Sequence, residues 1–121
     1  MSLQNLDLVH ALAHVQFSGA GVPSYGGGAG QQKGFDGSVA IVDNGPGDIT
    51  LTLKDEVGAD QVAIFANRAG ALAASGLVAI GWTMPTLKTI RVTILNEGAA
   101  GAVSALTDLD FDILVMKYPQ G

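Results

Sequence analysis

The fold class is decided by one stretch of the chain, Asp48-Ile49-Thr50-Leu51-Thr52-Leu53-Lys54. Its three aliphatic residues share one face of an extended chain, while the two threonines and the lysine share the other face. This strict alternation over seven residues is typical of a half-buried β-strand. Isoleucine and threonine are β-branched, which suits a pleated surface. The stretch therefore predicts a strand with one buried face.

Runs of the same kind recur on both sides of this stretch, separated by Gly, Pro, Asn and Asp. They predict further strands over Val9–Phe17, Ser38–Val42, Gln61–Asn67, Gly76–Thr83, Thr89–Ile94 and Asp110–Tyr118. The Asn-Gly and Pro-Gly pairs within residues 43–47 predict a tight turn. Short strands at regular spacing indicate a β-sandwich or barrel. A helix is the alternative over Leu6–Val15 and Ala66–Ser75.

The last predicted strand is apolar on both faces. Phe111, Ile113 and Val115 share one face, and Leu114 and Met116 share the other. A strand of this kind is either central in its sheet or covered by a neighbouring subunit.

The composition limits the classes of function. A length of 121 residues fits one domain, 1–121, with residues 1–8 as a possible N-terminal arm. Only 14% of the residues are charged, against roughly 25% in ordinary soluble domains. This shortage predicts an oligomer in which sister subunits cover part of the surface. The alternative is a monomer whose exterior is rich in Ala and Thr.

The composition also argues against several kinds of bond, site and partner. The chain has no cysteine, so disulfides and thiolate metal sites are excluded. A net charge of −5 with six Lys and Arg residues argues against nucleic acid. The longest apolar run, Ala69–Trp82, is interrupted by glycines and is shorter than the ~20 residues of a membrane-spanning helix.

His10 and His14 have the i, i+4 spacing of zinc ligands on a helix, but Ala11 stands where a zinc protease needs glutamate. On a strand the two side chains would share a face, roughly 13 Å apart and too distant to hold one metal ion. We therefore interpret both histidines as part of a polar strand face or a subunit contact.

The segment Gly19–Gly34 is rich in glycine and is predicted to be a long loop or arm that a partner could order. A phosphate-binding loop needs Gly-Lys followed by Ser or Thr, whereas Lys33 lies between Gln32 and Gly34. Nucleotide binding is therefore not expected.

Asp108, Asp110 and Asp112 alternate as the first ligands of a calcium loop do. The glycine and the bidentate glutamate of such a loop are replaced by Ile113 and Pro119. The aspartates are therefore predicted to be solvated or paired with Arg68, Lys88 or Arg91, and an inter-subunit calcium ion is the alternative.

No serine of the chain lies in a nucleophile elbow, so catalysis has no support. The single tryptophan, Trp82, is interpreted as a core or interface anchor, with a carbohydrate-stacking platform as the alternative.

The strand signature resembles that of small virion proteins of tailed bacteriophages. The resemblance rests on Gly47–Leu53, Gln61–Phe65, Lys88–Val92 and the closing Leu109–Val115 strand with its Asp-Phe-Asp sequence, and it covers roughly Phe35–Lys117. It implies a jelly-roll-like β-sandwich of about seven to eight antiparallel strands. Proteins of this kind form trimers in capsid cement (decoration) layers or at fibre tips, and they carry no catalytic residues.

The sequence thus predicts a non-enzymatic structural protein on the capsid surface that binds the major capsid protein as a homotrimer. No metal, cofactor, nucleic acid, membrane or small-molecule ligand is expected. The alternative is a tail-fibre or receptor-binding module that recognises a glycan through Trp82, Tyr25 or the glycine-rich loop, and a small sugar-modifying enzyme ranks third. The candidate contact residues are Leu6, Leu8, His10, Leu12, His14, Tyr25, Trp82, Leu114 and Met116.

Overall fold

The computed structural model describes residues 9–26, 32–58, 62–68, 78–96 and 105–117. Within these ranges the chain forms strands and no helix, which confirms the predicted all-β class. The strands are β1 (Val9–Phe17), β2 (Pro23–Tyr25), β3 (Val42–Gly45), β4 (Asp48–Thr52), β5 (Val62–Arg68), β6 (Val78–Thr86), β7 (Thr89–Asn96), β8 (Ala105–Leu106) and β9 (Phe111–Lys117). None of the described residues belongs to a helix that could cross a membrane.

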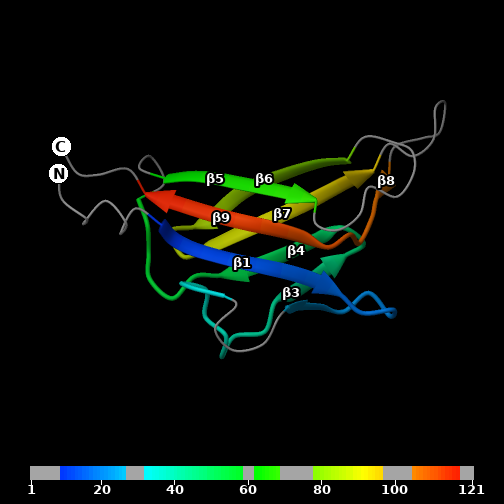
Figure 1. Ribbon diagram of the computed structural model, residues 1–121, viewed down its shortest axis with the longest axis horizontal. Coiled ribbons are helices and arrows are strands. Elements are labelled where there is room, and N and C mark those ends of the chain that lie inside the picture. The colour runs from blue at the N-terminus through cyan, green and yellow to red at the C-terminus, as the bar shows by residue number, and fades with distance from the viewer. Residues whose placement is uncertain (1–8, 27–31, 59–61, 69–77, 97–104, 118–121) are drawn as a thin grey trace.

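The strands form two antiparallel sheets, which lie as two layers in Figure 1. The four-stranded sheet has the order β2-β1-β9-β5. The five-stranded sheet has the order β3-β4-β7-β6, and the short β8 pairs with the end of β7. The C-terminal strand β9 lies between β1 and β5, so the predicted central position is confirmed.

The core lies between the two sheets and follows the alternation that the sequence predicts. On β4 and β7, every second residue is fully buried, as the pattern of Asp48–Lys54 indicates. Both sheets contribute to one continuous apolar cluster, which consists of Ala11, Ala13, Val15, Phe35, Ile49, Leu51, Leu53, Val57, Val62, Ile64, Ile90, Val92, Ile94, Phe111, Ile113 and Val115. The fold is therefore a β-sandwich. The finer jelly-roll assignment stays a prediction.

A short segment, Lys33–Asp36, joins the two sheets at one edge of the sandwich. Lys33 pairs with Leu12 of β1 through two backbone hydrogen bonds of 2.8 Å. Two residues later, Phe35 forms a bridge with Leu53 at the end of β4 and is fully buried. Since the chain changes direction between these pairings, the intervening Gly34 adopts a φ of 80°. We call Lys33–Asp36 the edge strap.

Several local predictions are wrong. The strand predicted over Ser38–Val42 begins only at Val42 and extends to Gly45, so only the Pro-Gly part of the predicted turn separates it from β4. The segment Gly19–Gly34, predicted as a loop, contains β2, because Pro23–Tyr25 pairs with the end of β1. The two helix alternatives are wrong where the structure describes them: residues 9–15 belong to β1, and residues 66–68 belong to β5. The remaining parts of Leu6–Val15 and Ala66–Ser75 lie outside the described residues.

Candidate functional site

The outer surface of the four-stranded sheet carries a row of apolar side chains. Strand register places Leu12 of β1 opposite Leu114 of β9, and Leu114 opposite Phe65 of β5. Met116 and Ala63 form the next pair along the same strands. Leu12 is 46% exposed and Phe65 is 52% exposed, although both are large apolar residues. We call these five side chains the apolar face.

A polar row borders the apolar face on one side. His14 lies opposite Asp112, which in turn lies opposite Asn67. His14 Nδ1 and Asp112 Oδ1 are 2.8 Å apart and form a hydrogen bond. The surface thus has an apolar centre next to a rim of polar groups.

The structure brings together four of the predicted contact residues, namely Leu12, His14, Leu114 and Met116. His10 does not lie with these four residues. The register between β1 and β9 shifts between Val9 and Ala11, so the alternation of side chains is broken at His10. His10 Nε2 instead donates a 3.0 Å hydrogen bond to the backbone carbonyl of Asp55, and the two histidines form no shared site.

The other predicted contact residues lie elsewhere. Leu6 and Leu8 lie outside the described residues. Tyr25 lies on β2, and Trp82 lies on the edge strand β6 with 40% of its surface exposed. Sequence reasoning missed Phe65, although a signal was present, because the run Ala63-Ile64-Phe65 is apolar on both faces of its strand.

The outer surface of the five-stranded sheet is centred on one ion pair, and it also carries the exposed apolar side chains of Val42, Leu95 and Leu106. Arg91 donates two hydrogen bonds to Asp48, from Nε to Oδ1 at 2.9 Å and from Nη2 to Oδ2 at 2.6 Å. The Asn44 amide donates to Asp48 Oδ1 at 3.4 Å and to Thr50 Oγ1 at 2.9 Å. Threonines on β4 and β7 flank the pair.

The predicted pairing of Arg91 with the C-terminal aspartates is therefore wrong. Asp108 Oδ1 accepts a 2.7 Å hydrogen bond from the backbone N–H of Gly47, and Asp110 Oδ1 accepts one of 2.9 Å from Phe17. The three aspartates thus serve three separate contacts. No group of three or more His, Asp or Glu side chains among the described residues is arranged to hold a metal ion.

The Asp48–Arg91 pair gives a prediction about acid stability. The hydrogen bond from Arg91 lowers the pKa of Asp48, and it outweighs the burial that acts in the opposite direction. Asp48→Asn is expected to reduce the free energy of unfolding near neutral pH by about 1–2 kcal/mol, because Arg91 loses its charged acceptor.

The sign of the pH dependence follows from this lowered pKa. The contribution of the carboxylate is complete above the unfolded value of about 3.9, and it is lost as the pH falls through the folded value. Urea unfolding at a series of pH values should therefore show the wild type and Asp48→Asn converging below about pH 4. Replacing the exposed Glu56 with glutamine serves as the control. A difference that stays constant into acid would contradict the prediction.

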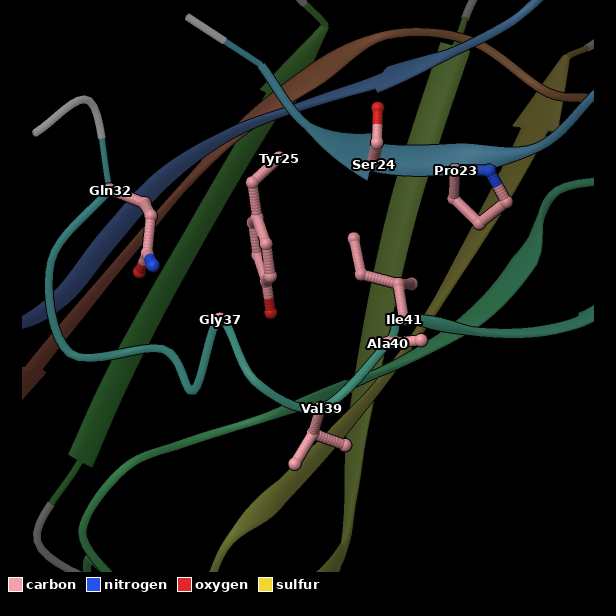
Figure 2. A pocket seen from close by; sticks show the side chains of 8 residues that line it. All are labelled: Pro23, Ser24, Tyr25, Gln32, Gly37, Val39, Ala40 and Ile41. Atoms are coloured by element: carbon pink, nitrogen blue, oxygen red, sulfur yellow. The ribbon is translucent and has the colours of Figure 1, made fainter. Parts of the chain in front are cut away.

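Among the residues that the structure describes, two surface hollows bear on the predicted contact residues Tyr25 and Trp82. The first has a volume of about 410 Å³, lies between β2 and the segment that precedes β3, and is lined by Pro23, Ser24, Tyr25, Gln32, Gly37, Val39, Ala40 and Ile41 (Figure 2). The second, of about 430 Å³, is lined by Gly81, Trp82, Thr83, Arg91 and Thr93.

Comparison with known proteins gave no match: no family model, no curated protein and no solved structure is significantly similar to this chain. Its function must therefore be inferred from its own surfaces.

Proposed function

We propose that this chain is a non-enzymatic structural protein of a tailed-phage virion. In this proposal it is a capsid cement protein that forms a homotrimer and binds neighbouring subunits of the major capsid protein. The observation that carries the proposal is the apolar face, where Leu12 and Phe65 are about half exposed and lie on either side of Leu114. Contiguous exposed apolar side chains on a small domain mark an interaction surface.

A second copy of the same chain is the occupant that fits this face. The face itself carries no charged side chain. Its polar border of His14, Asp112 and Asn67 corresponds to the polar rim that surrounds the apolar core of a protein–protein interface. Charged residues make up only 14% of the whole chain, which agrees with a surface that is partly buried inside an assembly. In a ring with cyclic symmetry each copy contacts two neighbours, and the sheet β1-β9-β5 would turn toward the axis.

The virion part of the proposal rests on the strand signature. The stretches that resemble phage virion proteins, Gly47–Leu53 and Leu109–Val115, contain β4 and most of β9. Both are inner strands of their sheets. Assembly through the four-stranded sheet would leave the threonine-rich surface around Asp48 and Arg91 free to face the capsid.

Phe65→Glu is expected to convert the assembled chain into a monomer. The substitution places a charge within the buried interface, where it would have no partner. Light scattering of the full chain measures the change as a fall in mass from a trimer to a single chain. Val42→Glu is the matched control, because Val42 is 49% exposed on the other sheet and should keep the trimer. A wild-type chain that is monomeric at all concentrations, or a Phe65→Glu variant that stays trimeric, would refute self-association.

Co-sedimentation with capsids tests the second half of the proposal. The sample is capsids of the phage that encodes the chain, stripped of their decoration layer. The wild-type trimer should pellet with these capsids, whereas Phe65→Glu should stay largely in the supernatant. A trimer binds the capsid through three weak contacts at once, and a monomer binds through one. A trimer that never pellets with capsids would contradict the cement role while leaving self-association intact.

A further inference from the structure

Among the described strands, four lie at the ends of the two sheets, and three of these are poorly suited to pair with another strand. The four-stranded sheet ends in β2 and β5, and the five-stranded sheet ends in β3 and β6. Strand β2 has three residues and begins with Pro23, and β3 has four residues with a register shift between Asp43 and Gly45. Strand β6 contains Pro85 within a register shift that follows Thr83. Short length, proline and bulges are features that keep edge strands from pairing with other chains.

The fourth edge strand, β5, has none of these features. Its seven residues, Val62–Arg68, pair with β9 without a register shift and include no proline or glycine. Arg68, at its end, is its only charged residue. Figure 1 shows β5 along the margin of the four-stranded sheet, with β9 on its inner side. A regular edge strand of this length is a template for pairing with a further strand.

The hydrogen bonds of β1 show which backbone groups of β9 point toward β5. Leu12 exchanges two backbone hydrogen bonds with Lys33, on the side of β1 that faces away from β9. Leu12 and the opposite residue Leu114 are therefore a pair without hydrogen bonds, because each residue directs its N–H and C=O groups to one side of its strand. The backbone groups of Leu114 consequently point to β5, where they form a hydrogen-bonded pair with Phe65.

The same alternation leaves a row of free backbone groups on β5. Because Phe65 directs its N–H and C=O groups to β9, its neighbours Ile64 and Ala66 direct theirs to the outer edge of the sheet. No backbone hydrogen bond joins these groups to another described residue. The side chains of Ile64 and Ala66 pack into the core, so the strand is held in place while its edge has no partner strand within the described part of the chain.

From this edge we propose that β5 pairs antiparallel with β5 of a second copy of the chain, so that the two four-stranded sheets become one continuous sheet. The two-fold axis passes through Phe65. Ile64 of each copy then lies opposite Ala66 of the other, and their free backbone groups exchange hydrogen bonds. The two Phe65 residues lie directly opposite each other, with their Cα atoms about 4.5 Å apart and their side chains on the same face. Aromatic pairs across neighbouring strands stabilise a sheet.

Length and charge favour this register. It pairs all seven residues of β5, whereas any other register leaves at least one end residue without a residue opposite. It also places Arg68 opposite Val62, so that no like charges face each other. Because the strand complements its own reverse in length, hydrogen bonds and charge, a second copy is the occupant that this edge fits.

The pairing goes beyond the proposed trimer and uses different groups. The apolar face points out of the plane of the sheet, whereas the free backbone groups of β5 lie in that plane. Pairing of the edges would join trimers to one another, and it would join single chains into dimers if no trimer formed. Each of the two contacts can therefore fail without the other.

The test is disulfide cross-linking, for which the chain is suited because it contains no cysteine. The proposed register places Ala63 opposite Asn67 of the second copy, in a pair without hydrogen bonds whose Cα atoms lie about 4.5 Å apart, within the range of a disulfide. Ala63→Cys and Asn67→Cys, mixed in dilute solution, concentrated and oxidised, should therefore form disulfide-linked pairs. Either variant alone should stay largely unlinked, because its two cysteines would lie roughly 13 Å apart along the strand.

The matched control is Val42→Cys mixed with Asn67→Cys. Val42 is exposed on the edge strand of the other sheet, so this mixture should not cross-link. Amide hydrogen exchange of the wild-type chain gives a second readout that needs no substitution. Exchange at Ile64 and Ala66 should slow by about tenfold or more as the chain is concentrated, because their N–H groups gain partners.

The outcomes separate the edge from the apolar face. No cross-link, equal cross-linking of the mixture and of either variant alone, or exchange at the two amides that does not depend on concentration would overturn the pairing. Trimers without the cross-link would overturn the pairing and leave the trimer intact. The cross-link in a chain that forms only dimers would support the pairing and refute the trimer.

Discussion

Gly34→Ala is expected to destabilise the fold by about 3 kcal/mol, because two separate costs coincide at this position. The first is conformational: Gly34 has a φ of 80°, which an L-residue with a side chain rarely adopts. The second is steric. A Cβ atom on Gly34 would overlap the backbone carbonyl oxygen of His10 and would lie 2.9 Å from the Cα of Ala11.

The clash falls on backbone atoms of β1, so no side-chain rotation relieves it. The edge strap would have to move away from β1, and its two hydrogen bonds with Leu12 would be lost. Phe35, which follows Gly34 directly, would then leave the core cluster.

Urea unfolding of the wild type, Gly34→Ala and Gly19→Ala measures this effect. Gly19 is the matched control, because no atom lies within 4 Å of a Cβ added there. Its replacement should change the free energy of unfolding by less than about 0.5 kcal/mol. Equal stability of the two variants would show that the strap does not hold the sheets together.

The strands with strict alternation could be predicted from the sequence for a physical reason. In β4 and β7 the core lies on one side only, so the buried aliphatic residues recur at every second position of the sequence. Two of the short strands, β2 and β3, were harder to predict. Val42–Gly45 has no buried side chain, and its three N-terminal residues are exposed, so no hydrophobic pattern marks it. Pro23–Tyr25 is set by pairing with the end of β1, which the local composition does not reveal.

The candidate site could be predicted only in part, because it depends on how distant strands are aligned. The outward residues Leu114 and Met116 stand out within their own strand, since a fully exposed face would not carry them. Leu12 and Phe65 come from strands that are far from β9 in the sequence. Only the register of the sheet shows that they are aligned with these outward residues of β9. The bulge that removes His10 from this surface has no signal in the residue types.

Phe111→Ala is expected to lower the free energy of unfolding by about 3–5 kcal/mol. Phe111 is fully buried on the inner face of β9 and belongs to the core cluster. Phe65→Ala is the matched control, because Phe65 lies on the outer face of the neighbouring strand and is 52% exposed. Its effect on the stability of the monomer should stay below about 1 kcal/mol. Unfolding must be measured at a concentration where the chain is monomeric, since assembly stabilises the folded state.

The same pair of variants separates folding from assembly. If the apolar face is an interface, Phe65→Ala should raise the concentration needed for trimer formation, whereas its monomer unfolds almost as the wild type does. Phe111→Ala should reduce stability in the monomer, at a site that no neighbouring subunit can reach. Equal losses of monomer stability for both variants would mean that Phe65 serves the fold rather than a partner. Both faces of the sheet would then stabilise the fold, and the exposure of Phe65 and Leu12 would need another explanation.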